Sequence, residues 1–77
     1  MLLSQYSAEL YLGSETPLKI ENASPKETKR IENMLKNKRT FTVRAVVGRG
    51  SSRTITINGA AVPWWSIDAG DYVLGSL

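Results

Sequence analysis

Residues 48–53, with the sequence GRGSSR, combine three residue types that bind phosphate groups. Arginine can hold a phosphate through two parallel hydrogen bonds, and serine hydroxyls contact phosphate oxygens without reading base sequence. Glycine lets the backbone approach an anion closely and direct its N–H groups toward it. The segment lacks the lysine and the spacing of a P-loop, which argues against a nucleotide hydrolase. Two interpretations stay open: a phosphate-binding connection, and a hairpin loop that arginine keeps soluble.

The charges are distributed unevenly along the chain. Its 77 residues carry a net charge of +3, but no acidic residue occurs between Asn33 and Ile67. An acid-free window over nearly half the chain favours an anionic partner over a role in solubility alone. The basic residues of this window are Lys36, Lys38, Arg39, Arg44, Arg49 and Arg53.

The residue types on which many enzymes and metal sites depend are scarce. The chain has no cysteine and no histidine, so it can form neither a disulfide nor a thiolate zinc site. Asp68 and Asp71 stand apart from other carboxylates in the sequence, and turn chemistry explains them better than a metal site does. No nucleophile–base pair or cofactor loop can be assembled. We expect no enzymatic activity, no metal and no cofactor.

Length and composition predict a single domain over residues 1–77. A chain this short buries only about 60% of the surface that its unfolded form exposes, so its core is thin and a second copy would add buried area. The amino-terminal segment is interrupted by Glu9 and does not have the pattern of a signal peptide. No segment approaches the length of a membrane span. We therefore expect a cytoplasmic protein without membrane contact.

The first half of the chain predicts two strands and one amphipathic helix. In the helix, Ser24 is suited to the N-cap, Pro25 to the first helical position, and Glu27 completes a capping box. Lys26, Lys29 and Arg30 are expected to lie on an ordinary solvated face. The predicted inward residues are Tyr6, Ala8, Leu10 and Leu12 in the first strand, Leu18 and Ile20 in the second, and Ile31, Met34 and Leu35 in the helix.

The second half predicts a two-stranded ribbon, because apolar residues recur at every second position in residues 41–47 and 54–57. Arg44 lies on the polar face of the first strand, and Arg49 and Arg53 sit at or beside the connection. We therefore expect three guanidinium groups near one end of the ribbon. The predicted class is α+β, with amino-terminal strands in residues 1–22, a helix in residues 24–37, and a basic, β-hairpin-rich region in residues 39–77.

Residues 58–65 admit two conformations. Asn58 and Gly59 are a strong signal for a two-residue hairpin turn. Alternatively, a short helix begins near Pro63 and places Trp64 and Trp65 in the core. Paired tryptophans can stack on bases, but in a domain this small we favour the core.

The segment TVRAVVGRGSSRTITINGAAVPWWSIDAGDYV resembles the AbrB-like swapped-hairpin family of small DNA-binding proteins, which includes transition-state regulators and antitoxins. Members tend to have a strand, a bend with glycine and arginine, a Thr/Ile strand, a short helix, and a Gly-Asp turn into another strand. The matching parts are residues 41–47, 48–53, 54–57 and 60–66, and then Gly70-Asp71, where we expect a turn into a final strand.

The resemblance implies an interleaved swapped-hairpin homodimer that binds double-stranded DNA and regulates transcription. Its DNA contacts would come from basic residues on strands and bends. The matching positions are Arg44, Arg49 and Arg53, with Lys38 and Arg39 as flanking contacts, and the chemistry of the connection adds Ser51 and Ser52. The alternative is a protein-binding module, such as a viral or accessory inhibitor, that uses Trp64 or Trp65 and the basic face, since tryptophan and arginine are favoured at interface hot spots.

Overall fold

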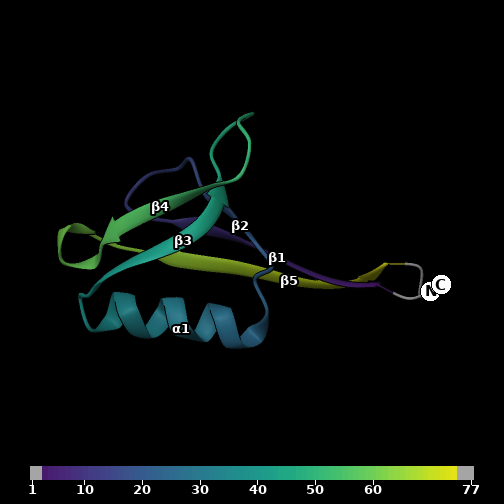
Figure 1. Cartoon of the computed structure of the whole chain (residues 1–77). Helices are drawn as coiled ribbons and strands as arrows, with labels where there is room; N and C mark the ends of the chain where they lie inside the picture. The colour runs from purple at the N-terminus through teal and green to yellow at the C-terminus, as the bar shows by residue number, and fades with distance from the viewer. Residues whose placement is uncertain (1–2, 75–77) are drawn as a thin grey trace.

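The structure, a computed structural model, describes the backbone of residues 3–74 and the side chains of residues 7–69. Within these residues, five antiparallel strands form one sheet in the order β4-β3-β2-β1-β5, and one helix, α1 (Pro25–Lys36), packs against it (Figure 1). The predicted α+β class is confirmed. The strands are β1 (Leu3–Tyr11), β2 (Leu18–Glu21), β3 (Thr40–Val46), β4 (Arg53–Asn58) and β5 (Ser66–Leu74).

Helix α1 begins where the sequence predicts. The Oγ of Ser24 accepts a hydrogen bond from the backbone N–H of Glu27 at 3.2 Å, and Pro25 stands at the start of the helix. The reciprocal half of the capping box is not formed, because the carboxylate of Glu27 binds Arg30 instead. One side-chain cap and a proline at the first position are enough to start the helix here.

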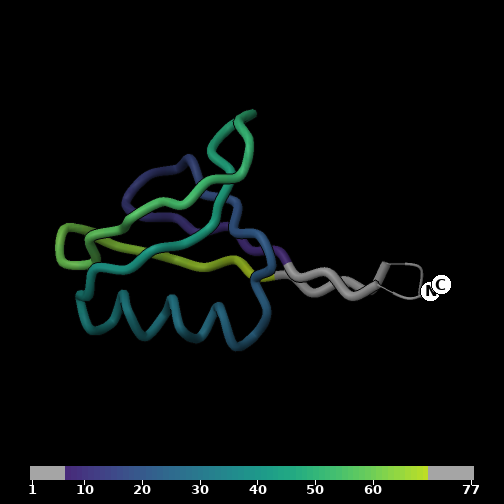
Figure 2. Tube along the Cα trace, viewed as in Figure 1, coloured from purple at the N-terminus to yellow at the C-terminus, as the bar shows by residue number. Residues whose placement is uncertain are grey.

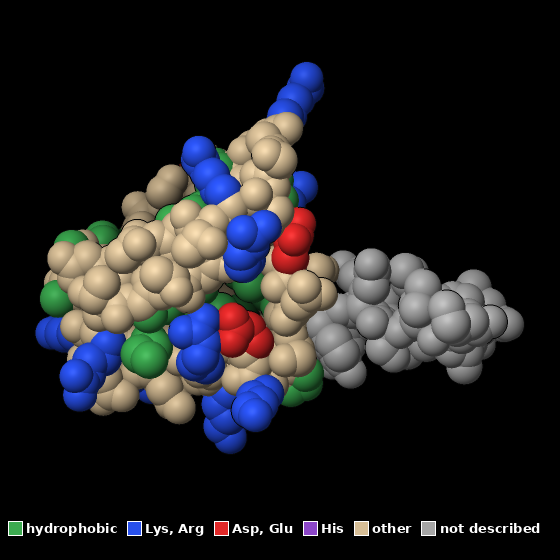
Figure 3. Space-filling view, viewed as in Figure 1, with side chains coloured by type: hydrophobic (Ala, Val, Ile, Leu, Met, Phe, Trp, Pro, Cys, Tyr) green, Lys and Arg blue, Asp and Glu red, His purple; other side chains and the backbone are tan. Residues whose placement is uncertain are grey.

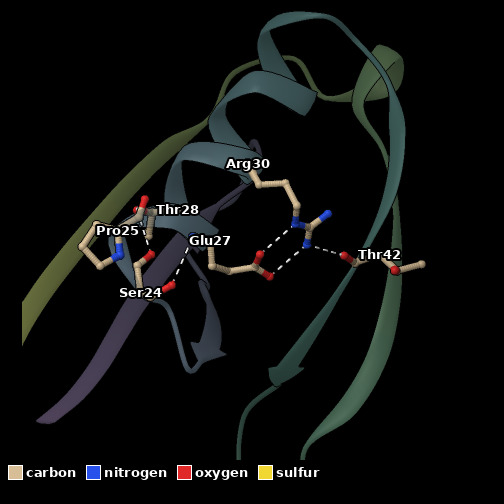
Figure 4. Close-up of polar contacts among 6 residues, drawn as sticks. All are labelled: Ser24, Pro25, Glu27, Thr28, Arg30 and Thr42. Carbon is tan, nitrogen blue, oxygen red and sulfur yellow. Dashed lines mark hydrogen bonds and ion pairs between the residues drawn. The ribbon is translucent and has the colours of Figure 1, made fainter.

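Strand β2 divides the sheet into two ribbons. It has only four residues, and it pairs with β3 through Lys19↔Val46 and Ile20↔Ala45. Beyond these pairs, the β3–β4 ribbon and the β1–β5 ribbon diverge, and the first crosses in front of the second in Figure 1. Helix α1 lies between them (Figure 4). The coiled sheet therefore has an inner face that is turned toward α1 and an outer face that is turned away from it.

The inner faces of both ribbons and one side of α1 form a single apolar core. Among the described residues, no polar or charged residue is buried as a whole. Trp65, Ile67 and Met34 pack against this core while keeping part of their surface exposed. The predicted inward position of Tyr6 lies outside the described side chains. The fully buried members are Ala8, Leu10, Ile20, Ala23, Ile31, Leu35, Phe41, Val43, Ala45 and Ile57, which confirms most of the predicted inward residues.

The connection from β4 to β5 differs from both predicted conformations. It begins with a single 3₁₀ turn, η1 (Gly59–Ala61), which the side-chain oxygen of Asn58 caps at 3.1 Å. Gly59 donates a hydrogen bond to the carbonyl of Arg39 at 2.9 Å, and a Cβ on Gly59 would lie 2.5 Å from that oxygen. The predicted hairpin is wrong because Gly59 is held against the turn before β3. The helical turn also ends before Pro63, so the chain crosses to the opposite edge of the sheet.

Strand β5 is continuous where the sequence predicts a turn at Gly70 and Asp71, so that prediction is wrong. The strand pairs with β1 along its length, including Ser7↔Gly70. A continuous antiparallel partner prevails here over the local preference of a Gly-Asp pair for a turn. The side chain of Asp71 lies outside the described residues.

Candidate nucleic-acid interface

The outer face of the β3–β4 ribbon is polar, exposed and free of carboxylates. Its residues oppose one another in register as Thr40↔Asn58, Thr42↔Thr56 and Arg44↔Thr54. All six side chains are exposed. Phe41, Val43 and Ile57, which alternate with them, are buried in the core and fix which side faces outward. We call these six residues, Thr40, Thr42, Arg44, Thr54, Thr56 and Asn58, the threonine face.

The predicted group of three arginines lies at one end of the ribbon but not on one face. Arg44 belongs to the threonine face, whereas Arg53 opposes Ala45, which is fully buried on the inner side. Successive residues of a strand point to opposite faces of the sheet. Arg53, which is next to Thr54 of the threonine face, therefore points to the inner side of the ribbon. Because it is the first residue of β4, its side chain is nevertheless exposed.

The loop between β3 and β4, residues 47–52, projects from the sheet (Figure 2). It is closed by a hydrogen bond from the N–H of Gly50 to the carbonyl of Val47 at 3.1 Å, and Gly48 has a φ of 61°. A Cβ on Gly48 would meet nothing within 4 Å, so the backbone angle alone favours glycine there. Arg49 is exposed, and Figure 3 shows Lys or Arg at the end of this projection.

The two serines of the loop differ in their access to a ligand. Ser51 is exposed and can reach a phosphate group. The Oγ of Ser52 is buried and has no hydrogen-bond partner. Ser52 therefore cannot contact a phosphate in this conformation of the loop.

Lys38 and Arg39 lie in the turn between α1 and β3, at the opposite end of the ribbon from the loop. Their N–H groups donate to the carbonyls of Leu35 and Met34, at 3.1 and 2.9 Å, and both side chains are exposed. At about 3.3 Å per residue, Arg39 and Arg44 are roughly 17 Å apart along β3. The predicted site residues thus form two basic groups, one at each end of the threonine face.

The prediction that Arg30 lies on an ordinary solvated face is wrong, because its guanidinium is held by other residues of the protein. Its guanidinium forms two hydrogen bonds with the carboxylate of Glu27, at 2.7 and 2.9 Å, and donates a third to the carbonyl of Thr42 at 2.9 Å (Figure 4). It also lies 6.0 Å from the centre of the Phe41 ring. Its contacts join α1 to β3, so Arg30 braces the fold.

The contact of Arg30 with β3 occurs where β2 no longer pairs with that strand. The register of β2 and β3 reaches only Ala45 and Val46, which leaves the first half of β3 without a neighbour on that side. Arg30 supplies a donor to one of the open carbonyls there. The hydrogen bonds between the two side chains lower the pKa of Glu27 and raise the pKa of Arg30. The three-residue spacing of Glu27 and Arg30 is typical of a helical ion pair, but Lys29 and Glu32 have the same spacing, so it does not predict the contact with Thr42.

The outer face of the β1–β5 ribbon has a different composition. Glu9 opposes Asp68 on one side and Lys19 of β2 on the other, and Tyr11 opposes Ser66. Asp68 is exposed and Glu9 is partly exposed. Two neighbouring carboxylates make this face a poor surface for a polyanion.

A shallow hollow of about 490 Å³ lies near the base of the projecting loop. Its charged residues, Lys19 and Glu21, have opposite signs, so the hollow has no clear preference for an anion. Glu21 is also the carboxylate that stands one register step from Arg44, yet the described residues form no ion pair between the two. The lining residues are Ser7, Lys19, Ile20, Glu21, Asn22, Val46 and Gly48.

No group of three or more carboxylates or other typical metal ligands is placed to hold a metal ion within residues 7–69. Among the described elements, α1 is not long and apolar enough to cross a bilayer.

The two tryptophans have different environments. Trp65 packs against the core, as predicted, whereas Trp64 is 50% exposed. The prediction of a core role is therefore confirmed for Trp65 and wrong for Trp64.

Comparisons with protein-family models, with curated proteins and with solved structures find no match to this chain. The AbrB-like resemblance stays a prediction. The ribbon and the basic bend agree with its expected parts, while η1 is shorter than the expected helix over residues 60–66 and β5 has no turn at Gly70.

Proposed function

We propose that this protein binds double-stranded DNA through the threonine face, with the β3–β4 ribbon lying in the major groove. The observation that carries the proposal is the composition of that face: six exposed side chains in register, none of them acidic, with basic groups at both ends. A phosphate-rich partner tolerates such a surface, whereas it would be repelled by the outer face of the β1–β5 ribbon.

The dimensions and the side chains of the ribbon suit this groove. The major groove is about 12 Å wide and admits a two-stranded β-ribbon. Strand β4 is an edge of the sheet, so no further strand widens the ribbon on that side. Arginine can bind guanine with two hydrogen bonds, asparagine can do the same with adenine, and threonine can contact the methyl group of thymine. Arg44, Asn58 and the four threonines thus provide chemistry for base edges.

The two basic groups would hold the flanking phosphates. Lys38 and Arg39 stand at one end, and Arg49 and Arg53 at the other. Lys38 has a φ of 55°, a backbone angle that favours glycine, and it directly follows a helix where glycine is common. Keeping a lysine there costs about 1 kcal/mol, which supports a use for its charge.

The proposal includes a cytoplasmic homodimer that regulates transcription, as the family resemblance implies. Within the described residues the five strands pair with one another in a single antiparallel sheet, and strand β4 at its edge is open to further pairing. Light scattering of the purified protein measures the oligomeric state. A dimeric native protein whose Arg44→Glu variant is also dimeric would agree with the proposal. A native protein that is monomeric at micromolar concentration would contradict the homodimer.

DNA binding is tested by fluorescence anisotropy with a blunt duplex of about 20 base pairs, at 50 and 200 mM salt. We expect Arg44→Glu to weaken binding at least about tenfold, because it replaces a phosphate or base contact with a repulsive charge. Lys26→Glu is the matched control, since Lys26 is exposed on α1, away from the threonine face. Equal losses in both variants, or no duplex binding by the native chain, would contradict the proposal.

A further inference from the structure

Trp64 is held outside the core by the residues around it. Trp65 packs against the core, whereas the adjacent Trp64, in the irregular segment before β5, is 50% exposed. Pro63 fits closely against Gly13, where a Cβ would lie 2.6 Å from the proline ring. The backbone that carries the exposed indole is therefore held on both sides, by Pro63 against Gly13 and by Trp65 against the core.

The chain that leads to Trp64 starts at a basic end of the molecule. The turn η1, five residues before it, is hydrogen-bonded through Gly59 to the carbonyl of Arg39 at 2.9 Å. Five residues span at most about 18 Å, which limits the separation of Trp64 from Gly59 and so keeps the indole within reach of a short single strand that starts at the α1–β3 turn. Figure 3 shows hydrophobic side chains and Lys or Arg side chains gathered where η1 and the α1–β3 turn lie.

The size of the apolar surface limits what can bind there. A stable protein–protein contact buries about 800 Å² on each partner, and a membrane-binding face needs a row of large apolar residues. Among the described residues, Trp64 alone is a large hydrophobic side chain with substantial exposure. One aromatic ring beside cations is too little for either partner, but it is what a single stacked base requires.

We infer that Trp64 stacks on an unpaired base of a single strand that continues from the bound duplex, with Lys38 and Arg39 holding the phosphates of that strand. This inference rests on the proposed duplex binding, because the same basic pair marks one end of the threonine face. The protein is then a binder of duplex ends, gaps or junctions, where paired DNA gives way to a single strand.

The test compares a blunt duplex with the same duplex carrying an overhang of about four thymidines, on either strand, in the anisotropy assay. We expect an overhang on one of the strands to tighten binding roughly tenfold, the range of one stacked base. Trp64→Leu should abolish this gain while leaving blunt-duplex affinity unchanged, because leucine is apolar but has no ring face. Trp64→Phe should retain part of the gain.

Tryptophan fluorescence provides a second measurement. A thymidine overhang should quench the emission of the native chain, and Trp64→Phe, which leaves Trp65 as the emitter, should show no quenching. The inference is overturned if neither overhang improves affinity, or if Trp64→Leu retains the gain that an overhang gives. If Trp64→Leu keeps the increase in affinity that an overhang gives, residue 64 makes an apolar contact with the overhang and does not stack on a base.

The two proposals can fail separately. Failure to bind any duplex, together with Trp64-dependent binding of an isolated thymidine strand, would overturn the threonine-face proposal and the duplex part of the inference, and would leave the stacking residue itself supported. Normal binding of blunt duplex with no effect of overhangs would overturn only the inference. Binding of Trp64 to anionic lipid vesicles in place of overhangs would also overturn it.

Discussion

The β3–β4 ribbon and the β1–β5 ribbon have similar inner faces and different outer faces. Inside, Leu10 and Ala8 of one ribbon and Phe41 and Val43 of the other belong to the same core. Outside, one ribbon has threonines, asparagine and arginine, and the other has Glu9 opposite Asp68. Burial constrains the inner residues alone, so the outer composition is free to serve another purpose. We therefore attribute the different composition of the two outer faces to the proposed binding of DNA by the β3–β4 ribbon.

The largest expected effect tests the equivalence of the inner faces. Leu10→Ala in β1 and Phe41→Ala in β3 should each lower the free energy of unfolding by about 2–5 kcal/mol, because both side chains are almost fully buried and their truncation leaves cavities. Urea denaturation measures both. A loss below about 1 kcal/mol for one variant would show that its ribbon contributes little to the core, and the two inner faces would not be equivalent.

A smaller effect tests the difference between the outer faces. Thr56→Glu on the threonine face should weaken DNA binding roughly tenfold, since a carboxylate would lie against phosphates or base edges. Ser66→Glu introduces the same charge on the outer face of the β1–β5 ribbon and should leave affinity unchanged within about twofold. Both sites are exposed, so neither change should alter stability by more than about 0.5 kcal/mol. Equal losses of affinity in the two variants would mean that an added negative charge weakens DNA binding wherever it lies, and would contradict a binding site on the threonine face.

The open edge of β3 gives a further difference between the ribbons. Arg30→Ala should destabilise the protein by about 1 kcal/mol, because it removes hydrogen bonds from a charged donor to the carbonyl of Thr42 and to Glu27. Lys29→Ala, at a neighbouring exposed position, should have almost no effect. Thermal unfolding of the three proteins measures this. If Lys29→Ala costs as much as Arg30→Ala, the brace is not specific.

The smallest expected effect is the pH dependence of the same brace. Because Arg30 lowers the pKa of Glu27 in the folded state, the carboxylate stabilises the fold above the ordinary pKa of a glutamate. That stabilisation is lost as the pH falls through the lowered pKa. The Glu27→Gln variant should be less stable than the native chain by about 0.5–1 kcal/mol at neutral pH, and the difference should shrink as the pH falls through the lowered pKa. A difference that does not change with pH would contradict this account.

Patterns that depend on neighbouring residues were predictable from the sequence. The alternation around Ala8, Leu10 and Phe41, and the cap at Ser24, are properties of single elements, and the structure confirms them. The tight turn signal at Asn58 and Gly59 failed, because a contact with Arg39 from a different part of the chain decides the conformation there. Tertiary partners therefore override local propensity at this connection.

The candidate site shows the same limit. Arg44 was correctly placed on a polar outer face, since that depends on alternation within β3 alone. The position of Arg53 depends on the register between two strands, which the length and shape of the loop determine. The role of Arg30 depends on where β2 ends, and the exposure of Trp64 depends on how Pro63 meets Gly13. Each of these features depends on a contact between residues that are far apart in the sequence, and local sequence patterns do not predict such contacts.

The most direct test of the central claim is a map of the residues that respond to DNA. Nuclear magnetic resonance spectra of the ¹⁵N-labelled protein, recorded during titration with a blunt duplex, report each backbone amide separately. Our account predicts the largest shifts in residues 38–44 and 49–58, and little change in residues 8–11 and 66–69. Shifts concentrated in β1 and β5 or along α1, with β3 and β4 unaffected, would contradict it.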